Sequence, residues 1–139
     1  MDKELEGRGL HFVRYADDCI IALKSEASAK RVMRTITIWI EKKLGLKVNM
    51  TKTHITKPQN LKYLGFGFYY NPQTKTWRSR PHKDSVKRFE RKLKQLTCRR
   101  KNMSFKIRVR QLNPVIRGWI NYYAISDMKT TMMRIDAHL

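Results

Sequence analysis

The stretch HFVRYADDCIIAL, residues 11–23, decides the fold of this chain. Two apolar, β-prone runs flank the adjacent carboxylates Asp17 and Asp18, and this pattern predicts a β-hairpin with both acids at or beside its turn. Neighbouring strand residues point to opposite faces, but a tight turn brings two acids to one rim. Carboxylate oxygens are ligands that Mg²⁺ prefers, so the pair is a candidate metal site. Aspartate is also common in turns for structural reasons alone, and from these residues both interpretations stay open.

The composition indicates a polyanionic partner. The 139 residues suit one ordinary domain or two small ones, and a hydrophobic content of 41% is enough for a modest core. Lysine and arginine outnumber the acids by 31 to 11, which gives a net charge of +20 and favours nucleic acid as the partner. Residues 1–56 carry +4, whereas residues 57–139 carry +16. The second part is therefore the expected polyanion-binding part.

Zinc, disulfide and membrane proteins are disfavoured classes. Cys19 and Cys98 lie far apart, with no Cys-x-x-Cys pair and no clustered histidine, so neither a zinc site nor a disulfide framework is expected. No apolar run approaches the roughly 20 residues that cross a bilayer, and the polar start of the chain is unlike a secretory signal. We therefore expect a reducing, cytoplasmic setting and no membrane partner.

The first part of the chain is predicted to be a sheet with one packed helix. The polar residues 1–9 are expected to be a lead-in to the hairpin. Apolar residues at three- and four-residue spacing, between a candidate N-cap at Ser25 and a candidate stop at Gly45, predict a helix over about 26–44. Further strands are expected over residues 46–57, 63–70 and 76–80, with turns around 49–52 and 71–75.

The second part is predicted to be all helix. Asp84 or Ser85 can cap a helix that is apolar on one side and basic over most of the rest. Further helices are predicted to begin near Ser104, at a fresh N-cap at Asn113 followed by Pro114, and near Asp127, the last with apolar residues up to Leu139. The predicted fold class is α+β, with a boundary near residues 79–83.

Four strings in this chain resemble motifs of one family. Residues 12–18, FVRYADD, resemble the Tyr-Ala-Asp-Asp box of reverse transcriptases, in the form found in group II intron-encoded reverse transcriptase/maturases. The other three follow in the family's order: LKVNMTKT (46–53) resembles the motif after the palm helix, YLGF (63–66) the primer-grip hairpin, and LNPVIRGWINYY (112–123) the signature of the maturase-specific domain, also called domain X or thumb. The last string is the most specific.

The resemblance implies a partial polymerase palm over residues 1–80, including the primer-grip hairpin, and a truncated all-α thumb over 81–139. It implies an RNA-directed DNA polymerase, a nucleotidyltransferase that copies intron RNA into DNA, and a maturase that binds group II intron RNA and helps it splice. Mg²⁺ would be the cofactor, with Mn²⁺ as an alternative ion. The implied site residues are Asp17 and Asp18 as catalytic metal ligands, and Tyr15, Ala16, Leu64 and Gly65 as contacts of the deoxynucleoside triphosphate and the primer end.

The resemblance also places Lys52 at a motif lysine that can donate a proton to the pyrophosphate leaving group. A solvated lysine or a phosphate contact is an equally open interpretation. Among the aromatic residues, Trp119 and Tyr123 share one helical face and are expected in the core, whereas Trp77 on a hairpin is a candidate for stacking on bases. The expected RNA contacts are Arg88, Arg91, Lys92, Arg108, Arg110 and Arg117.

The chain also departs from the family's pattern. Reverse transcriptases of this kind draw a third carboxylate from an earlier palm strand that follows a fingers domain, and residues 1–10 show no strand pattern that could supply it. We therefore expect that this fragment does not polymerise alone, and that an open sheet edge pairs with the missing fingers/palm segment or with a second copy. Two alternatives are a non-enzymatic RNA-binding splicing cofactor and a generic nucleic-acid-binding domain supported by charge alone.

Overall fold

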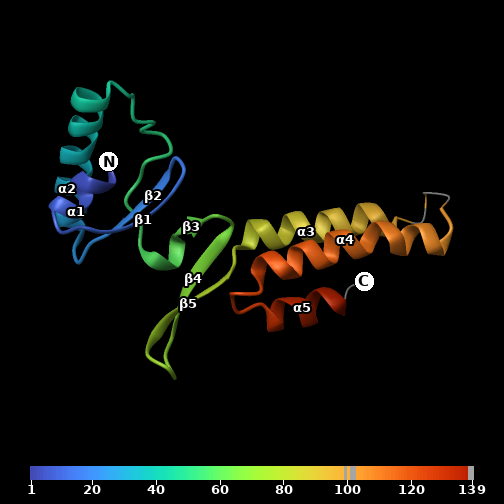
Figure 1. Ribbon diagram of the computed structural model, residues 1–139. Helices are drawn as coiled ribbons and strands as arrows, with labels where there is room; N and C mark the ends of the chain where they lie inside the picture. Colours follow the sequence, from blue (N-terminus) through green and yellow to red (C-terminus); the bar gives the residue numbers. More distant parts are fainter. Residues whose placement is uncertain (99, 101–102, 138–139) are drawn as a thin grey trace. The chain divides into compact units, whose positions relative to one another are not determined.

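The computed structural model describes residues 1–98, 100 and 103–137 (Figure 1). The chain forms two compact units, residues 1–56 and 57–139, and each is described by itself. Strands and helices occur in both units, which confirms the predicted α+β class. The compact units divide at residue 56, so the strands of the expected primer grip belong to the same unit as the C-terminal helices. The palm–thumb boundary near residue 80 stays a prediction.

The first unit is built around the predicted hairpin, which is confirmed. Strands β1 (His11–Tyr15) and β2 (Asp18–Ala22) pair antiparallel, with Tyr15 opposite Asp18. The segment before them is the short helix α1 (Asp2–Gly7), and not only a polar lead-in. Its Leu5 is fully buried. A single apolar side chain among polar ones gives little periodic signal, which explains why the sequence pattern missed this helix.

The helix predicted over 26–44 is confirmed, with a change in its last turn. Helix α2 (Glu26–Trp39) begins at the predicted cap, where the Ser25 hydroxyl accepts a hydrogen bond from the Ser28 backbone N–H at 3.2 Å. It continues as the π-helical turn η1 (Ile40–Leu44) and ends at Gly45, whose φ of +64° is the left-handed conformation of a C-cap glycine.

The strand expected over residues 46–57 is wrong, although its turn is present. The Asn49 side-chain oxygen accepts hydrogen bonds from the backbone N–H groups of Thr51, at 3.1 Å, and Lys52, at 3.2 Å. The backbone carbonyl of Asn49 also accepts from Lys52 and Thr53. These backbone N–H groups would bond to a neighbouring strand in a sheet. Because the asparagine side chain accepts their hydrogen bonds instead, the segment forms a turn without strand pairing.

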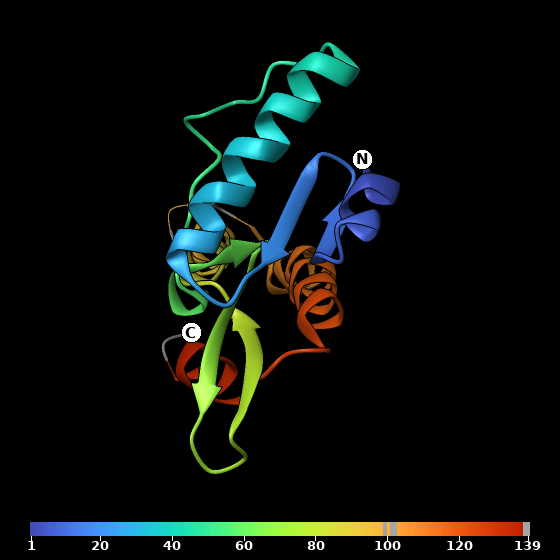
Figure 2. The ribbon, with the colours of Figure 1, turned by 90° about the vertical axis from the view of Figure 1, so that its left-hand side faces the viewer.

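The second unit begins with a three-stranded antiparallel sheet in the order β3–β4–β5. Its elements are the 3₁₀ turn η2 (Pro58–Asn60) and strands β3 (Lys62–Tyr63), β4 (Phe66–Asn71) and β5 (Thr76–Pro81). The prediction of one strand over 63–70 is wrong, because the chain reverses at Leu64 and Gly65. Their φ values of +49° and +82° are those of a tight hairpin turn. The turn predicted at 71–75 is confirmed, and Figure 2 shows this end of the β4–β5 hairpin extending away from the helices of the unit.

Three helices complete the second unit: α3 (Lys83–Thr97), α4 (Phe105–Tyr123) and α5 (Lys129–Asp136). The helix start expected at Asn113 is wrong, because α4 runs through Pro114. Proline removes one hydrogen bond from the helix, but Leu112, Val115, Ile116 and Trp119 on the same helix pack against the core and hold it in one piece. Leu139 lies outside the described residues.

The core of this unit lies between the helices. Val86, Phe89 and Leu93 of α3 and Ile135 of α5 are buried together, and the apolar face of α4 packs on them. Figure 1 shows α3 and α4 running alongside each other, with α5 folding back beside them. Within the described part of the chain, no helix has both the length and the apolar character needed to cross a membrane.

The N-cap of α3 is His82, and not Asp84 or Ser85 as expected. The Nδ1 atom of His82 accepts a hydrogen bond from the Asp84 backbone N–H at 3.2 Å. Only a neutral imidazole has a nitrogen that can accept. Burial lowers the pKa of His82, and the nearby carboxylate of Asp84 raises it by less. Both the cap and the burial therefore favour the neutral form.

This cap predicts a pH dependence of stability. Because the pKa of His82 is lower in the folded chain, its contribution to stability is complete above its ordinary pKa of about 6.5 and is lost as the pH falls through the folded value. Thermal melts at pH 7 and pH 5 should show a lower Tm at pH 5. The variant His82→Ser keeps a capping oxygen and should show a smaller difference. An equal pH dependence in both proteins would contradict this role.

Candidate active site and nucleic-acid interface

Asp17 and Asp18 lie at the tip of the β1–β2 hairpin. The loop is Ala16-Asp17, and Asp18 is the first residue of β2, so both carboxylates are exposed at one end of the hairpin, as predicted. Ala16 has a φ of +50°, a conformation that is strained for a residue with a Cβ atom. Tyr15, at the end of β1, is 65% exposed. The structure thus brings the four hairpin residues of the predicted site together.

Arg14 fixes the shape of this tip. Its guanidinium donates to both carboxylate oxygens of Asp2, at 2.6 and 2.7 Å, and to the backbone carbonyl of Ala16 at 2.9 Å. The hydrogen bonds from Arg14 lower the pKa of Asp2, and the same contacts raise the pKa of Arg14. No sequence pattern predicts this contact, because Arg14 and Asp2 are 12 residues apart and no local spacing rule connects them.

The hairpin tip has the ligand chemistry for Mg²⁺ but supplies only part of a site. Two exposed carboxylates suit an ion that keeps several waters and is shared with substrate phosphates. In residues 1–98, 100 and 103–137, no group of three or more His, Cys, Asp or Glu side chains is placed to hold a metal ion. Asp2 is connected to the turn through Arg14, but its carboxylate forms an ion pair with that guanidinium. Asp17 and Asp18 are therefore suited to supply two of the ligands of a metal centre.

Lys52 lies in the same unit, on the turn that Asn49 organises. Its side chain is exposed. An exposed lysine on a rigid turn is compatible with a phosphate contact and with a solvated surface residue. Its role therefore stays a prediction.

The turn at Leu64 and Gly65 is held by side chains of α3 and α4. The hydroxyl of Tyr122 donates to the Leu64 carbonyl at 2.8 Å. The Gly65 carbonyl accepts from the Ser85 hydroxyl at 2.9 Å and from the Tyr123 hydroxyl at 3.4 Å. The string YLGF and the end of the string LNPVIRGWINYY, predicted separately as primer grip and thumb signature, are therefore in direct contact.

A continuous set of aromatic rings supports this contact. Phe89 of α3 stacks on Trp119 with ring centroids 4.5 Å apart, Trp119 lies 4.6 Å from Tyr123, and Tyr123 meets Phe66 of β4 at 4.9 Å. Tyr123 is buried and Trp119 half-buried, so the prediction that these two rings belong to the core is confirmed. The rings fix the turn relative to the helices by packing as well as by hydrogen bonds.

A groove of about 720 Å³ lies over this contact. Leu64 and Gly65 line it together with Arg88 and Lys92 of α3. The rest of its lining is Lys62 of β3, Ser85 and Phe89 of α3, and apolar and aromatic residues of α4. The structure thus brings together the two expected primer contacts and two of the six expected RNA contacts. The other four do not line the groove: Arg91, Arg110 and Arg117 are exposed elsewhere on the helices, and Arg108 is half-buried.

The positive charge of this unit is little reduced by its acids. The sequence of residues 57–139 holds 20 basic and 4 acidic side chains. Three of the acids form ion pairs, Asp84 with Lys62 at 3.0 Å, Asp127 with Arg78 at 2.7 Å and Glu90 with Arg134 at 3.0 Å. These exposed pairs add little stability, but they neutralise the acids and leave a basic surface suited to a polyanion.

Comparisons with known protein families cover both units. The family model for reverse transcriptase (RNA-dependent DNA polymerase) matches residues 1–68, and the model for the group II intron, maturase-specific domain matches residues 86–139. The chain is therefore similar to both domains of the group II intron reverse transcriptase and maturase family. The two matches occur in the order that the four motif strings predict, which confirms the resemblance. This is a family of RNA-directed DNA polymerases, and the chain carries parts of both of its domains.

One relative of this chain is the COX1/OXI3 intron 2 protein of Saccharomyces cerevisiae. The two are 32% identical over 75 residues, which are 52% of this chain and 8% of that protein. The chain therefore matches a small part of the length of this relative. The groove is lined by residues from both family matches: Leu64 and Gly65 lie in the first, and Arg88 and Lys92 lie in the second.

Proposed function

We propose that this chain is the palm–thumb part of an RNA-directed DNA polymerase that also acts as the maturase of a group II intron. The observation that carries the proposal is the groove, which combines the Leu64-Gly65 turn with the basic side chains of Arg88 and Lys92. Basic walls suit the phosphate backbone, and an apolar floor suits sugars and base edges. The proposed ligands are the intron RNA, an RNA template and a DNA primer.

We propose Asp17 and Asp18 as the Mg²⁺ ligands of this enzyme, with Mn²⁺ as an alternative ion. When bound, the metal would activate the primer hydroxyl and neutralise charge on the triphosphate. Arg14 would keep the tip in one conformation by holding the Ala16 carbonyl. Tyr15 and Ala16 would position the deoxynucleoside triphosphate and the primer end, and Lys52 would contact its phosphates or protonate the leaving group.

The β1–β2 hairpin is proposed to pair with further strands. A two-stranded sheet is marginal in water, and each outer edge can accept another strand. Val13 on β1 is 60% exposed, so one face of the hairpin also carries an apolar side chain that a partner would cover. The proposed partner is the fingers and early palm segment of the same enzyme, with self-association as the alternative.

A non-enzymatic role is the second candidate. The excess of basic over acidic side chains in residues 57–139 supports binding of structured RNA as a splicing cofactor, whether or not the hairpin tip is complete. Both cysteines are free, which suits the reducing, cytoplasmic setting that we propose for either role. The assignment of residues 1–80 to the palm and 81–139 to the thumb belongs to the same proposal.

Filter binding tests the RNA-binding function. The chain is expected to bind a group II intron RNA more tightly than an unrelated structured RNA of equal length at every KCl concentration of a salt series. The double variant Arg88→Ala/Lys92→Ala should weaken binding roughly tenfold and reduce the slope of log Kd against log salt by about 2, because two phosphate contacts are lost. Equal affinity for both RNAs at every salt concentration would support charge alone and contradict maturase specificity.

The matched control is Lys87→Ala/Lys94→Ala. These two lysines lie on the same helix and carry the same charge, but they do not line the groove. Their loss should change the affinity by less than that of Arg88 and Lys92. An equal effect of both double variants would show that the groove has no special part in binding.

A further inference from the structure

We infer that the β4–β5 hairpin carries a second RNA contact, a stacking site for an unpaired base formed by Trp77 and Tyr70. The inference rests on the proposed RNA-binding function and adds a recognition mode to it. This site and the groove share no lining residue. The groove suits a backbone held between basic walls, whereas the hairpin offers exposed aromatic faces.

Trp77 and Tyr70 form an exposed aromatic pair. They lie opposite each other on β5 and β4, so both rings stand on the same face of the hairpin. Their centroids are 5.7 Å apart in an edge-to-face arrangement. Trp77 is 47% exposed and Tyr70 is 45% exposed, unlike Tyr123, which is 6% exposed. A ring that is half accessible has a face on which a base can stack.

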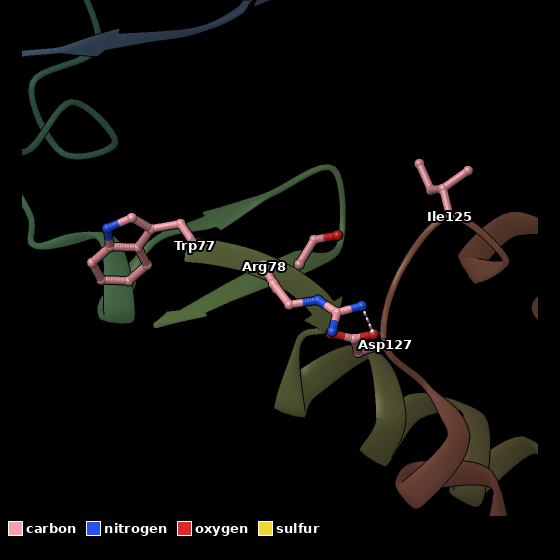
Figure 3. Close-up of a pocket in the computed structure, with 5 residues that line it drawn as sticks. Trp77, Arg78, Ile125 and Asp127 are labelled. Atoms are coloured by element: carbon pink, nitrogen blue, oxygen red, sulfur yellow. Dashed lines mark hydrogen bonds and ion pairs between the residues drawn. The ribbon is translucent and has the colours of Figure 1, made fainter. Parts of the chain in front are cut away.

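A hollow of about 240 Å³ adjoins the tryptophan. Ser79 and Asp127 line it together with Arg78, and Ile125, which is 84% exposed, lies on its other side (Figure 3). The volume is below the roughly 300–1,000 Å³ of sites for drug-sized ligands and suits a single flat ring. In Figure 3 the Trp77 indole points away from Arg78 and Asp127, so the hollow lies beside the tryptophan and leaves its ring face open to a base.

The aromatic pair is held on a preorganised support. Asp127 accepts from the Arg78 guanidinium at 2.7 Å and from the Tyr69 hydroxyl at 2.5 Å, and its backbone N–H donates to the Ser79 carbonyl at 2.9 Å. These contacts fasten the hairpin to the segment between α4 and α5. Arg80 lies over the ring of Tyr69, 5.3 Å from its centroid. A rigid support lowers the entropy that the site loses when a ligand stacks on it.

The positive charge of this unit favours nucleic acid, and not an apolar protein surface, as the ligand of the aromatic pair. The unit that carries the hairpin has a net charge of +16, and Lys75 is exposed in the turn of the hairpin itself. Phosphates that flank an unpaired base would meet this basic surface, whereas a protein partner would need a matching acidic face. Stacking on aromatic rings next to basic groups is a general mode of single-strand binding.

The test compares two RNAs with the full 139-residue chain. Fluorescence anisotropy measures the Kd for a labelled 12-nucleotide oligo(U), which is unpaired, and for a blunt RNA duplex of equal length. Trp77→Ala should weaken oligo(U) binding about tenfold, and Tyr70→Ala by less, with duplex binding unchanged within twofold. Trp77→Phe keeps a ring and should retain most of the affinity. Phe105→Ala, which removes an 81% exposed ring on α4, is the matched control and should have little effect.

The outcomes separate the inference from the function on which it rests. If the wild-type chain binds both RNAs and Trp77→Ala binds oligo(U) as tightly as Phe105→Ala does, the stacking site is wrong and the RNA-binding function stands. If the wild-type chain binds neither RNA, both are wrong. Quenching of tryptophan fluorescence by oligo(U) gives a second readout, and it should fall in Trp77→Phe if Trp77 is the stacking residue. Unchanged quenching in that variant would contradict the assignment.

Discussion

Replacing Asp17 by alanine is expected to abolish primer extension when this chain is combined with a fingers and early palm segment of a related enzyme. Loss of one of the two carboxylates at the hairpin tip removes a proposed metal ligand, and among the described residues no group of three or more His, Cys, Asp or Glu side chains is placed to hold the ion instead. The expected loss is at least about 1,000-fold, equal to about 4 kcal/mol of transition-state stabilisation. The measurement is extension of a DNA primer on an RNA template with Mg²⁺ or Mn²⁺.

The 139-residue chain without that segment is expected to give no extension, because two carboxylates are only part of a two-metal centre. Glu41→Ala is the matched control, since it removes one exposed carboxylate from the same unit but not from the hairpin. It should leave the combined enzyme active. Extension by the chain alone that disappears in Asp17→Ala would show that the tip is a complete site and contradict this expectation.

Replacing Gly65 by alanine is expected to lower the free energy of unfolding of the second unit by about 3 kcal/mol. A φ of +82° costs a residue with a Cβ atom about 1 kcal/mol. The new Cβ would lie 2.6 Å from the Tyr123 hydroxyl and 3.2 Å from the Ser85 hydroxyl. Because Tyr123 is buried between Trp119 and Phe66, it cannot move without loss of packing and of hydrogen bonds, each worth about 1 kcal/mol.

Thermal melts followed by circular dichroism give the measurement. A change of this size should lower Tm by about 10 °C or more in a unit of this length. Gly118→Ala is the control with the opposite sign, because a Cβ there meets nothing within 4 Å and Gly118 lies within α4. It should raise the stability by about 0.5–1 kcal/mol. A Gly65→Ala chain as stable as the wild type would show that the tyrosine hydroxyls do not constrain the turn.

Features that depend on neighbouring residues could be predicted from the sequence. The apolar, β-prone runs on either side of the two aspartates predicted the β1–β2 hairpin, and Ser25 and Gly45 predicted both ends of the helix between them. In these cases a side chain or a positive φ within a few residues decides the structure. The same holds for the carboxylates of the candidate site, because a two-residue turn fixes where they lie.

Features that depend on distant residues could not be predicted. Pro114 looked like a helix start because proline is favoured there, but packing of the flanking apolar residues on α3 outweighs that local preference. Asn49 competes with strand formation through its own side chain. The contacts that shape the candidate sites, Arg14 with Asp2 and Tyr122 with Leu64, join residues 12 and 58 positions apart. No short-range pattern contains that information.

The hydrogen bonds between Tyr122, Tyr123 and the turn at residues 64–65 also bear on how members of this family can be recombined. A chimaera that takes its C-terminal helices from one relative and its β3–β4 turn from another would combine tyrosines and backbone carbonyls that did not evolve in contact. The exchange should give a well-folded protein only when both pieces are transplanted together. A crossover that exchanges these helices should therefore lie before Lys62, and not between strand β5 and helix α3 near residue 82.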